Sequence, residues 1–335
     1  MLLNPSVMAL VLASAMVALM VMLASAFAVQ VLAHWDIASG SARQLKLERR
    51  TYLISTLLTW AFVAELLSLL LFVHNAEAMS DQFVGAMCAT GVLNLNAWGW
   101  PTLFLKIAVF FGGAVWLAMN RLDNQGHDYP LVRVKYALLL VLLPLVLAEF
   151  VVQLLHFSEM TPNVITSCCG ALFSADAEGV AAQVSALSPR TALLALAVSG
   201  IAVLSTGVLH ARSVRWGLPF AALSILAFGM ALVGIVSLIA LYVYEHPHHH
   251  CPFCLLKAGH DFVGYLLYVP LFTATGLALS GAVISRWQHI SSLADAAARE
   301  RARFSWSAVI LFALFYAVAA ALVIASNLTM MEVWW

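Results

Sequence analysis

Eight long apolar stretches constrain this chain more than any other feature of its sequence. A helix that crosses the hydrocarbon core of a bilayer needs about 20 mostly apolar residues, because its backbone groups must bond to one another without water. The sequence therefore predicts an all-α, polytopic integral membrane protein, with a single membrane domain over residues 1–335 and no separate soluble domain. The predicted helices cover residues 7–33, 52–74, 102–119, 136–156, 191–210, 219–243, 262–285 and 306–326.

The composition agrees with a membrane location and excludes one class of partner. The chain is 63% hydrophobic and only 10% charged, whereas about 25% of the residues of a soluble domain are charged. Its 16 basic and 16 acidic residues balance, and they form no basic tract that could follow a phosphate backbone. We therefore expect the lipid bilayer as a partner and no nucleic acid.

The basic residues predict the orientation of the helices. Thirteen of the 16 lie in or beside the loops that follow the first, third, fifth and seventh helices, while the opposite loops hold only Arg190 and Lys257. By the positive-inside rule both termini are extracytoplasmic, and we expect a multi-pass protein of the cytoplasmic (inner) membrane of a bacterium. The first basic residue is Arg43, so the start of the chain lacks the charged region of a secretory signal, and we expect the first helix to be retained.

Two spacings suggest that the chain is built from repeated two-helix hairpins. The basic loops recur at Arg50, Arg133, Arg215 and Arg299, every 82 to 84 residues. Cys88, Cys169 and Cys251 are likewise separated by 81 and 82 residues. Such a period is typical of internal duplication, although any evenly spaced bundle of eight helices would have a similar one.

All five cysteines fall on the extracytoplasmic side of the predicted topology. Cysteines that merely filled space would scatter through helices on both sides. An oxidising compartment permits disulfides, so the distribution indicates redox or soft-metal chemistry at that side. The cysteines are Cys88, Cys168, Cys169, Cys251 and Cys254.

The strongest motif is Cys251-Pro252-Phe253-Cys254, directly after a histidine-rich stretch. In C-x-x-C one thiol can attack a disulfide while the second resolves the product, and a nearby imidazolium favours the thiolate. The same thiols, with one or two imidazoles, can complete a four-coordinate zinc or copper site. Leu255 follows Cys254, so C-x-x-C-H is absent and no covalent c-type haem is signalled. The candidate imidazole ligands are His246, His248, His249 and His250.

The other three cysteines could take part in either chemistry. Cys168 and Cys169 are adjacent, so a bond between them would be strained and labile, whereas two vicinal thiolates readily bind a thiophilic metal. This dipeptide resembles the vicinal pairs of membrane mercury-uptake proteins. Cys88 lies in a segment rich in Gly, Asn and Pro, which predicts a turn or re-entrant loop. This segment either presents Cys88 as a relay partner of Cys251 or of the vicinal pair, or holds it as a free buried thiol.

Three ionisable residues lie inside predicted helices, namely Glu65, Lys106 and Glu149. Such groups are costly in hydrocarbon and usually face the interior of a bundle. We therefore expect both glutamates to point inward, with at least one of them near Lys106. Glu149, Gln153 and His156 follow one another along one helix face, which indicates a proton or quinone path.

The arrangement is similar in plan to quinone-linked disulfide-forming membrane enzymes and to relatives of vitamin K epoxide reductase. The likeness rests on Cys251-Pro252-Phe253-Cys254 together with the loop cysteines Cys88, Cys168 and Cys169. It implies a thiol-disulfide oxidoreductase that exchanges electrons with a quinone and a periplasmic thiol protein. Those families use a smaller bundle and lack the histidine stretch.

Two other functions stay open. The same Cys and His residues could serve a protein that binds or transports copper, zinc or mercury. The chain could also be a non-catalytic membrane subunit of a transporter or respiratory complex, in contact with other membrane subunits. The sequence leaves open whether the chain is an enzyme.

Overall fold

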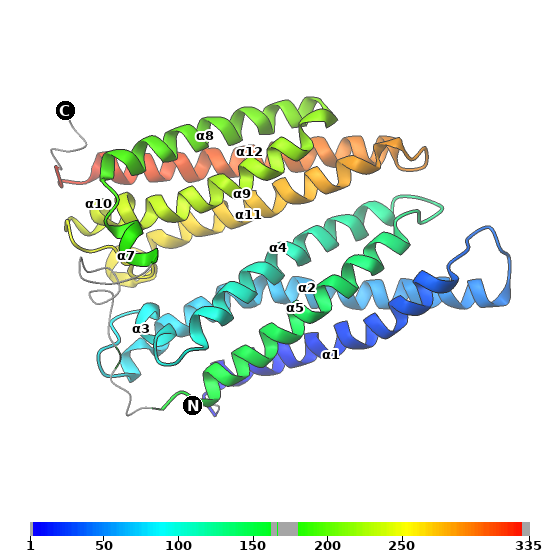
Figure 1. Ribbon diagram of the computed structural model, residues 1–335, viewed down its shortest axis with the longest axis horizontal. Coiled ribbons are helices and arrows are strands. Elements are labelled where there is room, and N and C mark those ends of the chain that lie inside the picture. The colour runs from blue at the N-terminus through cyan, green and yellow to red at the C-terminus, as the bar shows by residue number, and fades with distance from the viewer. Residues whose placement is uncertain (1–2, 162–165, 167–179, 330–335) are drawn as a thin grey trace. The chain divides into compact units, whose positions relative to one another are not determined.

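The computed structural model describes residues 3–161, 166 and 180–329 (Figure 1). Within these ranges the regular structure is helical and contains no strand. The chain divides into two compact units. Unit one comprises Met1–Asn75, Asn96–Thr161 and Val283–Arg301, and unit two comprises Ala76–Leu95, Pro162–Ala282 and Ala302–Trp335.

The predicted set of membrane-spanning segments is present. Eight helical segments of the described chain are long and apolar enough to cross a bilayer, which supports a multi-pass membrane protein. Seven of them correspond to α1 (Pro5–His34), α2 (Ala42–Met79), α4 (Gly99–Asp123), α5 (Val132–Ser158), α8 (Pro189–Arg212), α11 (Val263–Ser285) and α12 (Ala294–Ala325). The remaining span runs through α9 (Gly217–Gly234), η3 (Ile235–Ile239) and α10 (Ala240–Tyr244).

Two helices begin well before the predicted spans. α2 begins at Ala42 rather than near residue 52, and α12 begins at Ala294 rather than near residue 306. Their first turns are rich in Ala, Arg, Leu and Glu, which are strong helix formers but too polar to count as membrane-spanning. Hydropathy therefore located the apolar part of each helix and missed its polar extension.

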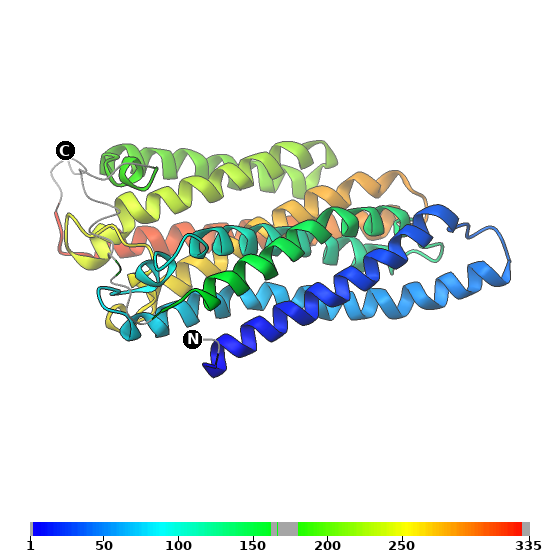
Figure 2. The ribbon, with the colours of Figure 1, turned by 60° about the horizontal axis from the view of Figure 1, so that its bottom comes forward.

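Helices α1, α2, α4 and α5 form the core of unit one and run alongside one another in both views (Figures 1 and 2). Their buried apolar side chains make one cluster that includes Phe62, Trp116 and Tyr136. The indole of Trp116 donates to the carbonyl of Lys135, and the Tyr136 hydroxyl lies beside Ser55. The large aromatic side chains thus fill the core while their polar atoms keep partners.

A buried ion pair fixes the turn between α4 and α5. Lys135 Nζ lies 2.7 Å from Asp123 Oδ2 and donates to Asn120 Oδ1 at 2.9 Å. The other carboxylate oxygen of Asp123 accepts the backbone N–H of Leu131 at 2.8 Å. Both charged side chains are almost completely buried. One carboxylate therefore satisfies a buried ammonium and closes the connecting loop.

Unit two is built around α8, α9, α11 and the apolar part of α12. Phe220, Leu267 and Phe312 lie in its core, each fully buried. A π-helical turn, η3, interrupts the span that begins with α9, and the helix ends at Glu245, whose φ is 51°. The chain then enters the segment that carries the histidines and the C-x-x-C motif.

The predicted orientation can be tested with two glycines that have open space around them. A Cβ atom added at Gly40 or at Gly259 would meet nothing within 4 Å, so cysteine fits at both positions. A membrane-impermeant thiol reagent added to intact cells should label Gly259→Cys and leave Gly40→Cys unlabelled until lysis. The parent chain, labelled in parallel, gives the baseline from the native cysteines. The opposite labelling pattern would reverse the orientation.

Candidate functional site

Three thiols from distant parts of the sequence meet in unit two. The sulfur atoms of Cys88, Cys251 and Cys254 all lie within 4.8 Å of one another. Cys88 Sγ and Cys251 Sγ are 3.3 Å apart, although 163 positions separate these residues in the sequence. We call this group the three-thiol site. It joins the C-x-x-C motif to one of the predicted loop cysteines.

A sharp turn brings Cys88 to the site. Gly85 has a φ of 86°, and a Cβ atom there would collide with the carbonyl oxygen of Thr166, so only glycine fits. Thr166 in turn donates from its backbone N–H to Val84 O and from its hydroxyl to Gly91 O. Cys88 follows this turn in an extended conformation and precedes the short helix α3 (Ala89–Leu93). The predicted turn at Cys88 is therefore present.

Two tyrosines hold the backbone of the C-x-x-C segment. The Tyr244 hydroxyl, at the end of α10, donates to Cys251 O at 2.6 Å. The Tyr268 hydroxyl, on α11, donates to Pro252 O at 2.8 Å. Because one anchor lies on each side of the loop, the positions of Cys251 and Cys254 are set by two helices rather than by the loop alone.

Glu77 connects the two cysteine-bearing segments. Its Oε2 accepts the backbone N–H of Ala89, next to Cys88, at 2.8 Å. Its Oε1 lies 3.3 Å from Nζ of Lys257, three residues beyond Cys254. Glu77 therefore acts as a positioning residue for the three-thiol site. Burial disfavours the charged form of Lys257, but the nearby carboxylate of Glu77, together with Cys254 and Asp81, raises the pKa of Lys257 above its ordinary value.

The sulfurs themselves are shielded from solvent. Cys88 and Cys251 are 0% exposed and Cys254 is 7% exposed. The Thr90 hydroxyl lies 3.5 Å from Cys251 Sγ, within hydrogen-bonding reach of a sulfur atom. A large partner protein cannot reach these atoms in this conformation, whereas a small ion can be enclosed by them.

The histidines surround the motif but do not join the thiols. Among the residues that the structure describes, the group of mutually close ligand atoms holds sulfur alone. His246 and His248 are exposed. The ring of His249 stacks near Tyr244, with ring centroids 4.1 Å apart.

His250 has a defined tautomer. Its Nδ1 lies 3.0 Å from Val236 O, in the π-helical turn η3. A carbonyl oxygen can only accept, so Nδ1 carries the hydrogen and Nε2 presents its lone pair. Partial burial lowers the pKa of His250 below its ordinary value, and the neighbouring His248 and His249 lower it further. His250 is therefore held as a neutral imidazole.

The vicinal pair Cys168 and Cys169 lies outside the described residues. Its predicted part in redox or metal chemistry stays a prediction.

The predicted intramembrane residues form a second cluster, in unit one. Lys106 Nζ lies 2.6 Å from Glu149 Oε1, and all three of Lys106, Glu149 and Glu65 are at most 3% exposed. Gln153 and His156 lie farther along α5 and are fully buried. The expected inward orientation and the expected pairing with Lys106 are both present. The predicted proton or quinone path stays a prediction.

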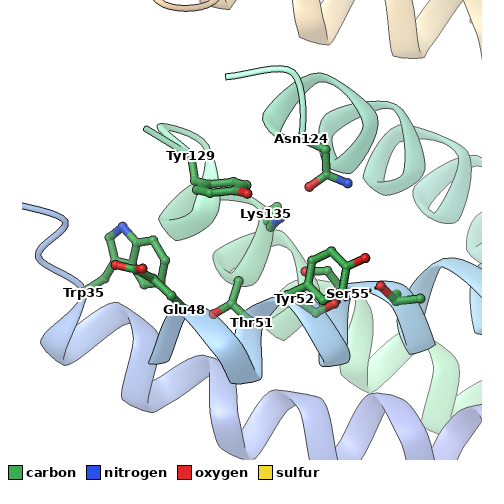
Figure 3. A pocket seen from close by; sticks show the side chains of 9 residues that line it. Trp35, Glu48, Thr51, Tyr52, Ser55, Asn124, Tyr129 and Lys135 are labelled. Carbon is green, nitrogen blue, oxygen red and sulfur yellow. Dashed lines mark hydrogen bonds between the residues drawn. The ribbon is translucent and has the colours of Figure 1, made fainter. Parts of the chain in front are cut away.

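Unit one also contains a cavity of about 150 Å³ at the ends of its helices (Figure 3). Trp35, Glu48, Thr51, Tyr129 and Lys135 are among its lining residues. None of these was predicted as a site residue. Lys135 is already paired with Asp123, so the charge of this one lining residue is compensated within the protein.

Sequence reasoning missed the residues that position the three-thiol site. Glu77, Thr90, Tyr244 and Tyr268 carry no motif, and each acts through a contact with a segment distant from it or with the backbone. The sequence offered one signal for Lys257, which is one of only two basic residues in the loops predicted to be extracytoplasmic.

Two substitutions of Glu77 should distinguish the contributions of its two contacts to the free energy of unfolding. Glu77→Ala removes a charged acceptor from the Ala89 N–H and should lower the free energy of unfolding by about 1.5–3 kcal/mol. Glu77→Gln keeps a carbonyl oxygen for that N–H and loses only the partly exposed pair with Lys257, which is worth at most about 1 kcal/mol. Chemical unfolding in detergent measures both values. Equal losses in the two variants would contradict the backbone contact.

The neutral state of His250 predicts that the stability of the fold depends on pH. The unfolded imidazole takes up a proton at its ordinary pKa of about 6.5, and the folded one does so only at lower pH. The contribution of His250 to stability is therefore complete above that pKa and is lost as the pH falls below it. The melting temperature should drop between about pH 7.5 and 5.5. His250→Asn, whose amide can still donate to Val236 O, should show a smaller drop, and an unchanged drop would refute the assignment.

No protein-family model, no curated protein and no solved structure matches this chain. The three-thiol site and the buried charged cluster therefore supply the observations from which a function can be proposed.

Proposed function

We propose that this chain is a membrane protein that binds a soft metal ion, copper(I) above all, through Cys88, Cys251 and Cys254. The observation that carries the proposal is the convergence of three sulfurs, each within 4.8 Å of the others. Thiolates select copper(I) and other thiophilic ions over magnesium and calcium, which require oxygen ligands. The protein handles its ion at the extracytoplasmic side of a bacterial inner membrane, as the distribution of basic residues predicts.

The distances suit a shared ion. A metal–thiolate bond of about 2.3 Å implies ligand sulfurs about 4 Å apart in a trigonal or tetrahedral site. The sulfurs here are separated by 3.3 Å for Cys88 and Cys251, and by at most 4.8 Å for the other pairs. Small rotations of the three side chains suffice to bring all of them to bonding distance. Their burial then excludes water and oxygen from the bound ion.

The charges and the neighbouring imidazoles fit the same proposal. Lys257 lies beside Cys254 and offsets part of the negative charge of three thiolates. His246 and His248 lie shortly before Cys251 in the sequence and are exposed. They offer imidazole nitrogens for the initial capture of an ion. The chain therefore offers exposed imidazoles for capture and buried thiolates for retention.

One observation favours a second function, thiol-disulfide exchange. The 3.3 Å contact between Cys88 Sγ and Cys251 Sγ is close enough for one sulfur to attack the other. The Cys88 thiolate attacks Cys251 in a Cys251–Cys254 disulfide, the Cys88–Cys251 bond forms, and Cys254 leaves as the thiolate. A quinone, reduced to the quinol, would supply the oxidation that makes the first disulfide.

Metal loading provides the main test. The purified protein, loaded with copper(I) under reducing conditions, should retain one ion per chain, and elemental analysis measures the ratio. Cys88→Ser, Cys251→Ser and Cys254→Ser should each lose the ion, because two thiolates hold it less tightly. A chain with both Cys168→Ser and Cys169→Ser tests separately whether the vicinal pair adds ligands to the ion. The bound ion should leave at low pH as the thiolates take up protons.

The outcomes of this test separate the two functions. If all three single variants bind copper as the parent does, the metal proposal fails. A Cys88–Cys251 disulfide found by peptide mapping in Cys254→Ser, without metal retention in the parent, supports exchange instead. If neither result appears, the three thiols serve only to pack the loops, as in a non-catalytic membrane subunit.

A further inference from the structure

We infer that Glu65, Lys106 and Glu149 form a proton-binding site inside unit one, which holds one exchangeable proton. This inference concerns unit one alone and does not depend on the three-thiol site. Lys106 pairs with Glu149, and Glu65 shares one face of α2 with Ser68 and Phe72, which both contact Lys106 Nζ. The cluster therefore contains two carboxyl groups and one ammonium, and each of the three residues is at most 3% exposed. If all three were charged, an uncompensated negative charge would be buried among apolar helices. Binding of one proton removes that charge.

The contacts of Lys106 decide which carboxyl group is ionised. Lys106 Nζ lies 2.6 Å from Glu149 Oε1 and donates to Ser68 Oγ at 2.7 Å. The same nitrogen lies 5.7 Å from the centre of the Phe72 ring, whose face also favours a cation. The ammonium is thus held in its charged form beside Glu149. The proton is therefore assigned to Glu65.

The remaining surroundings supply no competing charge. α1, which packs against α5, has His34 as its only ionisable residue, at its far end. α2 contributes Glu65 and Ser68, and its His74 lies farther along the helix and is exposed. α4 contributes Lys106, and α5 contributes Glu149 and His156. Lys135, also on α5, is compensated by Asp123 at the other end of that helix. The charge balance of the cluster is therefore set by its own three residues.

A row of buried acceptors leads away from the cluster along α5. Glu149 Oε2, Gln153 Oε1 and His156 Nε2 are buried and have no hydrogen-bond partner within the described part of the chain. They lie at successive turns on one face of the helix. Buried polar atoms without a donor are rare. Three of them in a row offer successive positions for a proton that leaves or enters the site.

The chemistry of His156 suits the end of this row. Asn96 donates from its side-chain amide to His156 O at 2.9 Å, which turns its Oδ1 toward His156 Nδ1 at 2.8 Å. Nδ1 must therefore carry the hydrogen, and Nε2 presents a lone pair that can accept a proton. Gln153 is held by donation to Ser14 Oγ at 3.0 Å, which leaves its oxygen as the acceptor.

Infrared spectroscopy of the purified full chain tests this site, because a protonated carboxylic acid has its own C=O stretching band. The wild-type protein at neutral pH should show the band of one buried carboxylic acid, and the band should shift in D₂O. Glu65→Gln should abolish the band and leave the melting temperature unchanged, since it replaces one neutral group with another. Lys106→Met should double the band, because both carboxyl groups then lack a cation and bind protons.

A matched control comes from the other buried pair. Asp123 and Lys135 form a one-to-one pair with no surplus carboxyl group, so Asp123→Asn should leave the band as it is. Glu149→Gln should also abolish the band, because Glu65 then loses its proton to become the partner of Lys106. Absence of the band from the wild-type protein would overturn the inference, and so would its survival in both Glu65→Gln and Glu149→Gln. A band that does not shift in D₂O would show a trapped proton and would overturn the exchange.

Discussion

The absence of water from the hydrocarbon core of a bilayer governs every polar contact in this protein. A buried donor, acceptor or charge that finds no partner within the chain costs several kcal/mol there. Lys135 is held by Asp123 and Asn120, Lys106 by Glu149 and Ser68, and Gln153 by Ser14. These contacts join different helices, so they define which helix faces meet. Removing one partner of such a pair costs about 3–5 kcal/mol, since the other charge remains buried.

The three-thiol site lies where regular helices give way to turns, and the same constraint shapes it. The segments around Cys88 and Cys251 contain backbone groups that are not hydrogen-bonded within a helix. Side chains provide the hydrogen-bond partners of these groups instead. Glu77 accepts one of these N–H groups, while Tyr244 and Tyr268 donate to two of the carbonyls. The polar contacts that keep the irregular backbone satisfied are therefore the ones that fix the sulfurs. Structure and chemistry at this site depend on the same few side chains.

Hydropathy and charge were sufficient to predict the eight apolar spans, because both reflect the partition of whole segments between lipid and water. They did not predict the polar first turns of α2 and α12, which depend on helix propensity instead. The C-x-x-C motif is visible in the sequence, and Cys88 was named with Cys168 and Cys169 as a possible partner, but the sequence did not single it out. The contact of Cys88 with Cys251 requires the left-handed turn at Gly85 and the anchor at Glu77, and both act between segments distant in sequence. The pairing of Lys106 with Glu149 was predictable because lipid leaves a buried cation few alternatives.

The π-helical turn η3 has a consequence for how this protein can change over evolution. A turn of this kind contains one more residue than an α-helical turn, and therefore rotates the remainder of the span by about 100° about the helix axis. η3 lies between α9, which packs in the core of unit two, and Tyr244, whose hydroxyl holds Cys251. It also contains Val236, whose carbonyl accepts the hydrogen of His250. Deletion of a single residue here would leave the apolar composition of the span intact while turning Tyr244 away from its loop. A chain of this type can thus lose its site through a change in length that no comparison of hydrophobicity would detect.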